Sequence, residues 1–284
     1  MRRTREIAAN IGFTEGPVWT RAGRLIVTSM TRGLVYELDL GGGVTGRTET
    51  GGGPNGLAED ATGAVWVAQN GGTIVASRSD RPAAPGLQRI VDGVVEDVVA
   101  AGLLAPNDLV EGPDGRIWFT DPGGTPGRVH AFDPRGGGVE ELAGGIAYPN
   151  GLAFDACGEF LYVAETRTGR VLRYGWDGST LQPLGVFATL SAGSPDGLAF
   201  DADGNLYAAS PDADLVAVFD PDGREREPLR FAGPTFPTNL CFAGPELDVL
   251  VVTAAKGGRV LAVDAVAKGA RPAAGTPVPG SGGG

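Results

Sequence analysis

Several residue types that build enzyme active sites are scarce in this chain. Its 284 residues include one histidine and two cysteines. A single histidine, His130, excludes a histidine dyad, and no Gly-x-Ser-x-Gly motif is present to supply a serine nucleophile. Cys157 and Cys241 lie far apart with no Cys-x-x-Cys motif, so a disulfide framework is not predicted. Function must therefore be sought among oxygen-bearing side chains.

Long apolar stretches are also absent. No run is long enough to span a membrane, and the basic residues 1–6 are not followed by the apolar segment of a signal peptide. The formal net charge of -11 argues against nucleic-acid binding. We expect a cytoplasmic protein that acts on a small molecule, without nucleic-acid or membrane partners, as a monomer or small homo-oligomer.

Glycine and proline, by contrast, are abundant. The 48 glycines and 21 prolines recur between short apolar runs, a pattern typical of many short strands and turns. One tetrapeptide pattern, Pro followed by Asn or Asp, any residue and Leu, recurs at residues 54–57, 106–109, 149–152 and 195–198. The chain therefore contains an internal repeat.

The repeat can be aligned on six anchor residues. These are Glu15, Asn55, Asn107, Asn150, Asp196 and Asn239, at intervals of 40 to 52 residues. Such a period, with several strands in each unit, indicates a β-propeller. We predict an all-β fold, a six-bladed β-propeller with four-stranded antiparallel blades around a central channel. It would form a single domain over residues 1–265, followed by a loosely ordered Gly/Pro-rich tail over 266–284.

Each repeat unit predicts the same order of strands. An innermost strand such as 151–155 precedes a glycine turn, an alternating apolar strand such as 160–164 and a third strand such as 169–174. Residues 6–11 are expected to close the ring by pairing with the last blade, since an open ring would expose strand edges. Residues 78–85 are predicted to form an inserted surface loop. His130, in a third strand, is expected to point from a blade surface.

The anchors predict a metal site at the channel. Because each precedes or begins an innermost strand, the side chains of Glu15, Asn107, Asn150 and Asp196 should converge on one face. Two carboxylates and two amides suit a hard cation such as Ca²⁺. Asn55, by contrast, is interpreted mainly as a turn residue, and Asp155 and Asp201 as turn carboxylates.

The same motifs resemble those of the senescence-marker-protein/gluconolactonase family. The similar runs are residues 14–19, 106–109, 112–122, 149–153 and 194–198, in the family's order within residues 11–264. The resemblance implies a six-bladed propeller with one catalytic divalent cation. It further implies that Glu15, Asn150 and Asp196 bind this cation, and that Asn107 is a further ligand or a substrate contact. Ca²⁺ is the expected ion, with Zn²⁺, Mn²⁺ and Mg²⁺ as alternatives.

The resemblance also implies metal-assisted hydrolysis of a lactone. Asp196 would bind the metal and take a proton from water, and Asn107 and Asp121 are the other predicted catalytic residues. The alternative for Asp121 is a turn carboxylate before Pro122. A carboxylate beside a cation is a poor base, so Asp121 or Asp108 is an alternative proton acceptor. The alternatives to a lactonase are a non-hydrolytic metal-dependent reaction and a non-catalytic binding platform.

One departure from the family pattern bears on the substrate. Sugar-lactonase relatives often carry arginine two residues before the third anchor, where this chain has Ala105. The guanidinium group that could hold sugar hydroxyls is therefore missing. We predict a substrate less polar than an aldonolactone.

Overall fold

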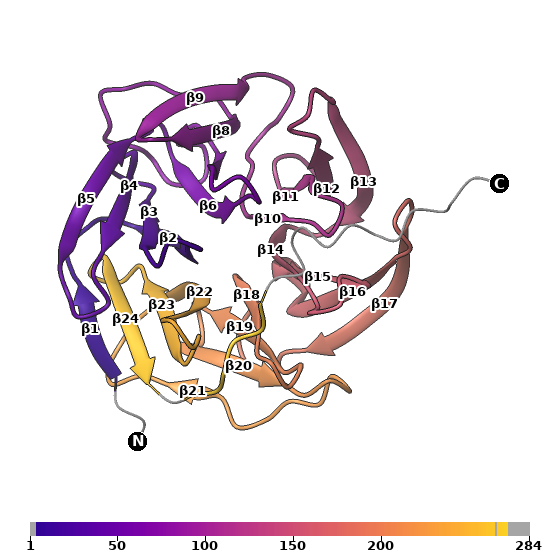
Figure 1. Cartoon of the computed structure of the whole chain (residues 1–284). Coiled ribbons are helices and arrows are strands. Elements are labelled where there is room, and N and C mark those ends of the chain that lie inside the picture. Colours follow the sequence, from indigo (N-terminus) through magenta and orange to yellow (C-terminus); the bar gives the residue numbers. More distant parts are fainter. Residues whose placement is uncertain (1–3, 265, 272–284) are drawn as a thin grey trace.

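The computed structural model describes residues 4–264 and 266–271. Its strands form six antiparallel sheets of four strands each, arranged as a ring (Figure 1). The predicted six-bladed β-propeller is confirmed. Among the described residues, no helix is long and apolar enough to cross a membrane, and both cysteines are free thiols.

In the first five blades, the four strands follow one another in sequence from the centre outward. Blade 1 contains β2 (Thr14–Trp19), β3 (Leu25–Ser29), β4 (Leu34–Leu38) and β5 (Val44–Glu49). Blade 2 contains β6 (Pro54–Glu59), β7 (Val65–Gln69), β8 (Gly86–Val91) and β9 (Val94–Val99). Blade 3 contains β10 (Leu109–Glu111), β11 (Ile117–Asp121), β12 (Gly127–Phe132) and β13 (Val139–Ile146).

The remaining blades complete the ring. Blade 4 contains β14 (Pro149–Phe154), β15 (Phe160–Glu165), β16 (Arg170–Trp176) and β17 (Leu181–Thr189). Blade 5 contains β18 (Leu198–Phe200), β19 (Leu206–Ser210), β20 (Leu215–Phe219) and β21 (Leu229–Arg230). Blade 6 contains β22 (Pro237–Ala243), β23 (Val249–Ala254), β24 (Arg259–Asp264) and β1 (Thr4–Ala8).

The two ends of the propeller meet in blade 6. Strand β1 pairs antiparallel with β24, with Thr4 opposite Val263, so the N-terminal segment closes the ring as the sequence predicts. The pairing begins two residues earlier than the predicted segment 6–11. Closure leaves no gap between the first and last blades at which a foreign strand could pair.

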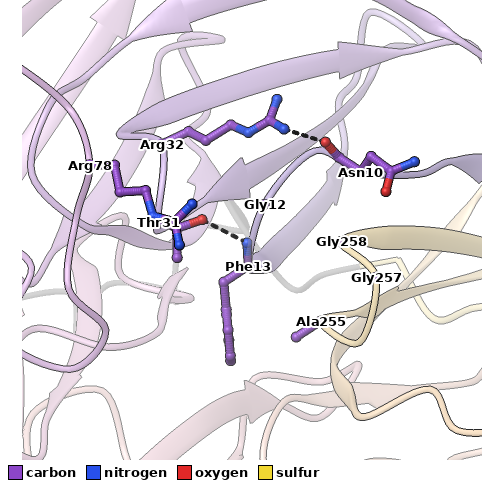
Figure 2. A pocket seen from close by; sticks show the side chains of 9 residues that line it. All are labelled: Asn10, Gly12, Phe13, Thr31, Arg32, Arg78, Ala255, Gly257 and Gly258. Carbon is purple, nitrogen blue, oxygen red and sulfur yellow. Dashed lines mark hydrogen bonds between the residues drawn. The ribbon is translucent and has the colours of Figure 1, made fainter.

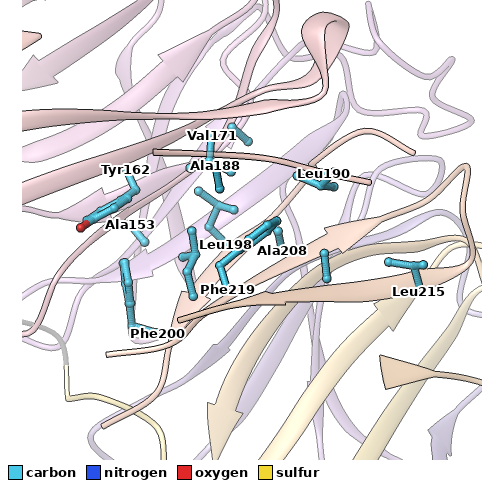
Figure 3. Close-up of a cluster of buried hydrophobic side chains, with 13 residues drawn as sticks. Ala153, Tyr162, Val171, Ala188, Leu190, Leu198, Phe200, Ala208, Leu215 and Phe219 are labelled. Atoms are coloured by element: carbon cyan, nitrogen blue, oxygen red, sulfur yellow. The ribbon is translucent and has the colours of Figure 1, made fainter. Parts of the chain in front are cut away.

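The core lies between the blades. Each of the six buried hydrophobic clusters joins two neighbouring blades, and together they run around the ring. Figure 3 shows the cluster between blades 4 and 5, where Tyr162 and Val171 face Phe200 and Phe219. Such face-to-face burial fixes the blades against one another, and so fixes what their inner ends present to the channel.

Two features of the blades test finer predictions. Asp155 and Asp201 accept backbone hydrogen bonds within their own turns, which confirms their interpretation as turn carboxylates. The prediction for His130 is wrong, because its ring is buried. His130 pairs with Phe119 across β11 and β12, and the two rings stack with centroids 5.2 Å apart. Side chains opposite each other on neighbouring strands pack together on the same face of a sheet. Phe119 therefore covers the His130 ring.

Residues 266–271 contact blades 5 and 6. Within this segment, Lys268 O accepts a hydrogen bond from Ala202 N (2.7 Å), and Gly269 N and Ala270 N donate to Leu247 O (2.8 Å) and Phe200 O (3.0 Å). The segment falls within the predicted tail. The rest of that tail, 272–284, lies outside the described residues.

Candidate active site

The anchor residues lie where the inner strands begin. Strands β2, β6, β10, β14, β18 and β22 surround the centre of the ring (Figure 1). The pairing register shifts between Glu15 and Val18 in β2, between Pro54 and Leu57 in β6, and between Pro149 and Leu152 in β14. A bulge of this kind bends a strand and re-aims its side chains, and bulges are common beside active sites. Glu15, Asn55 and Asn150 sit in these bulges.

A ring of hydrogen bonds fixes the backbone at the anchors. Every pair of neighbouring blades contributes at least one contact, and four of the six acceptors named below are carbonyls of anchor residues. The contacts are Thr28 Oγ1 to Asn55 O (2.7 Å), Gly56 N to Asn107 O (2.7 Å), Thr120 Oγ1 to Asn150 O (2.7 Å), Gly151 N to Asp196 O (3.1 Å), Gly197 N to Thr238 O (2.9 Å) and Thr238 Oγ1 to Thr14 O (2.8 Å). The rigid scaffold therefore extends to the residues of the site.

This ring corrects the alignment of the last repeat. Thr238 O accepts the bond from blade 5, so Thr238, and not Asn239, occupies the anchor position of blade 6. Asn239 instead corresponds to Asp108, one residue after its anchor. Both Thr238 and Asn239 are polar, which allowed the sequence alignment to slip by one residue.

Three carboxyl groups share the channel. Glu15 is 5 % exposed and Asp108 is 8 % exposed, whereas Asp196 is partly exposed. Burial, with the charge of Asp108, raises the pKa of Glu15 to about 8. Burial also raises the pKa of Asp108 to about 6, and burial with the charges of Glu15 and Asp108 raises that of Asp196 well above its usual value. Carboxyl groups that raise one another's pKa lack a compensating positive charge.

The amides complete an oxygen-rich donor set. Asn107 is 5 % exposed and Asn150 is 7 % exposed, and the Asn150 amide hydrogen-bonds to the Asp196 carboxylate. Asn55 Oδ1 is fully buried, and no donor among the described residues pairs with it. A buried carbonyl oxygen without a partner is costly, but a bound cation would satisfy it. The described part of the chain has no group of three His, Cys, Asp or Glu side chains arranged for a metal, so amide oxygens would have to complete any coordination shell.

Asp121 holds a loop. Its carboxylate accepts hydrogen bonds from Leu104 N (2.8 Å), Ala105 N (2.8 Å) and Gly123 N (3.0 Å). Glu165, the last residue of β15, likewise accepts a bond from Ala147 N (3.0 Å), just before the anchor of blade 4. Asp121 and Glu165 therefore lie at equivalent positions, where each pins the segment that leads into the inner strand of its own blade.

Apolar side chains border the end of the channel at which the anchors lie. Tyr148 and Phe236 each precede the proline of an inner strand, with φ values of 66° and 54°, which are strained for bulky residues. Phe236 is 40 % exposed and contacts Phe13 edge to face, and Leu104 is 52 % exposed. Burial and the charge of Asp196 raise the pKa of Tyr148, so its hydroxyl lies near the carboxyl groups.

Two other hollows differ from this site. A cavity of about 760 Å³ opens on the opposite side of the channel, and its lining includes Asp108 and Asn239 but none of the anchors among the described residues. A second hollow has a volume of about 370 Å³ and lies between blades 1 and 6. Arg32 and Arg78 are among the residues that line it (Figure 2). No carboxylate lines this second hollow within the described ranges, so it does not suit a cation.

The structure thus brings most of the predicted site residues together. Glu15, Asn107, Asn150 and Asp196 all lie at anchor positions of one ring. Sequence reasoning missed that Asn239 and Asp108 meet, with Asn239 Nδ2 donating to Asp108 Oδ2 at 3.2 Å. The signal was available in the sequence, because aligning residues 237–240 with the Pro-x-x-Leu pattern gives Asn239 the same repeat position as Asp108.

Two lactonases are similar to this protein along most of the chain. Pentonolactonase XacC of Haloferax volcanii is 29% identical over 267 residues, covering 90% of this chain and 86% of that protein. The 6-deoxy-6-sulfogluconolactonase of Pseudomonas putida is 28% identical and covers 86% of this chain and 84% of its own length.

The fold and the family agree with these relatives. The crystal structure of a putative gluconolactonase superposes with a TM-score of 0.80 at 26% identity, covering 95% of this chain and 94% of that one. Residues 13–256 match the SMP-30/Gluconolactonase/LRE-like region. The chain belongs to the SMP-30/gluconolactonase/LRE-like family.

Proposed function

We propose that this protein is a divalent-metal-dependent lactonase. The observation that carries the proposal is the set of three uncompensated carboxyl groups, Glu15, Asp108 and Asp196, surrounded by asparagine amides at the channel. Membership of a family whose named relatives include a pentonolactonase and a sulfogluconolactonase supports lactone hydrolysis.

The cation would be held by Glu15, Asn150 and Asp196, with Asn107 beside them. All supply oxygen, which favours Ca²⁺, although Zn²⁺, Mn²⁺ and Mg²⁺ accept some of the same ligands. When bound, a divalent cation polarises a carbonyl group and stabilises negative charge on its oxygen. Asn55 Oδ1, buried and without a donor, is available as a further oxygen ligand.

The protein's own groups orient the reactants and move the proton. Asp196 is the most exposed of the three carboxyl groups, so we assign to it the role of accepting the proton of the attacking water. Its hydrogen bond from Asn150 holds the carboxylate in place. Asp121 keeps Leu104 and Ala105 in position beside Asn107, and in this proposal it is a positioning residue.

The substrate is proposed to carry fewer hydroxyl groups than a sugar lactone. Ala105 offers no guanidinium, and its backbone N–H is already bonded to Asp121. Leu104 and Phe236 expose apolar surface at the same side of the channel. An alkyl-substituted lactone would bury this surface, whereas a polyhydroxylated ring would lack the guanidinium donors that could hold its hydroxyls.

A lactone panel tests the proposal. Protein stripped by a chelator should hydrolyse lactones only after Ca²⁺, Zn²⁺, Mn²⁺ or Mg²⁺ is added, with acid release as the measurement. Alkyl lactones should be cleaved with a higher kcat/KM than glucono-1,5-lactone. Full turnover in the stripped protein would contradict the metal requirement, and glucono-1,5-lactone as the best substrate would contradict the proposed polarity.

The Asp121→Asn variant separates positioning from proton transfer. Asparagine keeps one acceptor oxygen but turns an N–H toward a backbone N–H, so we expect a loss of stability of about 1–3 kcal/mol. Activity at saturating metal should fall less than tenfold. The measurements are urea unfolding and kcat. A loss of activity as large as that of Asp196→Asn, without loss of stability, would instead make Asp121 the proton acceptor.

A further inference from the structure

The position that follows each anchor is a glycine in four blades and a polar residue in two. The glycines are Gly16, Gly56, Gly151 and Gly197, and the polar residues are Asp108 in blade 3 and Asn239 in blade 6. Blades 3 and 6 lie on opposite sides of the six-membered ring (Figure 1). The two longer side chains therefore face each other across the channel.

The neighbouring glycines leave room for this pair. A Cβ atom on Gly56 would lie 2.3 Å from Asp108 Oδ1, and one on Gly197 would lie 2.1 Å from Asn239 Oδ1. Carbon and oxygen do not approach so closely without a bond, so neither glycine tolerates a side chain here. The glycines and the polar pair thus form one packed layer just below the anchors.

The hydrogen bonds fix the orientation of the Asn239 amide. Its Oδ1 accepts from Leu240 N (2.8 Å), which leaves the NH₂ group to point into the channel. Nδ2 donates to Asp108 Oδ2 at 3.2 Å, and Asp108 Oδ1 accepts from Leu109 N at 2.9 Å. An asparagine NH₂ group has two hydrogens, and the second is available to the Glu15 carboxylate, which Asn239 also contacts.

We propose that Asn239 is a positioning residue of the cation site, whose amide holds the carboxylates of Glu15 and Asp108 side by side at the floor of the channel. Carboxylates this close repel each other, and an amide that donates to both offsets the repulsion and limits where Glu15 can point. The same pair separates the anchors from the 760 Å³ cavity on the other side. This inference rests on the proposed metal site.

The expected consequence lies in metal affinity. Groups that orient a ligand from behind typically change affinity or activity by roughly 10–100-fold when they are removed. Asn239→Leu keeps the approximate volume but removes both donors. We expect it to bind Ca²⁺ roughly 10–100-fold more weakly than the wild-type protein, measured by titration calorimetry of the chelator-stripped proteins.

A double-mutant cycle tests whether Asn239 acts through Glu15. In a Glu15→Gln background, which lacks the charged ligand, Asn239→Leu should change the affinity for Ca²⁺ less than twofold. Independent effects would add in full. Asn239→Ser, which is smaller and keeps one donor, is measured in parallel and replaces Asn239→Leu in the cycle if that variant does not fold.

A matched control comes from blade 5. Asn205 Nδ2 also donates to a carboxylate, Asp201 Oδ2, at 2.8 Å, but in a turn away from the channel. Asn205→Leu should leave the affinity for Ca²⁺ unchanged. Unchanged affinity in Asn239→Leu, or full additivity in the cycle, would overturn the inference while the metal site stands. A wild-type protein that binds no divalent cation would overturn the proposed function as well.

Discussion

Replacing Asp196 by asparagine is expected to lower kcat/KM for the preferred lactone by roughly 10²–10⁴-fold, the usual contribution of a general base. The change removes both the negative charge and the proton acceptor but keeps the shape of the side chain. The fold should persist, because the backbone bonds of Asp196, from its N–H to Ala209 O (2.8 Å) and from Gly151 N to its carbonyl (3.1 Å), do not involve the carboxylate.

The two roles of Asp196 can be separated by metal concentration. Loss of a charged ligand weakens metal binding, and saturating metal would restore the bound cation but not the proton acceptor. We therefore expect kcat at saturating metal to stay low. Asp222→Asn is the control, because it removes an exposed carboxylate of the same blade that pairs with Arg224 and does not bond to the ring of anchors. Near-normal kcat in Asp196→Asn would exclude Asp196 as the base.

The ring itself could be predicted from sequence because its cause is local. The alternating strand recurs in every blade, five blades share the Pro-x-x-Leu entry, and five share the turn glycine, so the period specifies six units. The closing strand followed from a physical requirement, that a propeller cannot leave its first and last blades unpaired. Four oxygen donors at equivalent repeat positions then had to converge at one end of the channel.

Contacts between distant repeats could not be predicted in this way. The hydrogen bond from Asn239 Nδ2 to Asp108 Oδ2 joins blades 3 and 6, which the repeat period alone does not bring into contact. The sequence also gives no sign of the hydrogen bonds from Leu104 N and Ala105 N to Asp121, because an aspartate before a proline is equally typical of a turn. The prediction that His130 points from a blade surface was wrong because the pattern of a single strand does not show which side chains of neighbouring elements cover each of its faces.

The metal-free protein is expected to lose stability as the pH rises from 6.5 to 8.5. Glu15 has a pKa of about 8 in the folded protein and an ordinary value near 4.5 when unfolded, so over this range the folded state holds a proton that the unfolded state has released. Stability falls with rising pH wherever the folded state binds more protons. The raised pKa of Asp196 acts in the same direction.

The size of the effect follows from the same linkage. Each extra proton held by the folded state costs about 1.4 kcal/mol of stability per pH unit, so we expect a fall of roughly 1–3 kcal/mol across the range. Urea unfolding of chelator-stripped protein at several pH values measures it. The depressed pKa of His130 acts in the opposite direction, but mainly below the ordinary histidine value of 6.5.

Glu15→Gln is the decisive comparison because it leaves His130 in place. Glutamine has no proton to release, and without the charge of Glu15 the pKa of Asp196 is raised less. The stability of this variant should therefore change much less with pH than that of the wild-type protein. It should also exceed the wild-type stability at pH 8.5, where the buried carboxylate is ionised without a cation. Equal pH dependence in the two proteins would show that Glu15 is not a proton-holding group of the channel, and so would remove the charge argument for a cation beside it.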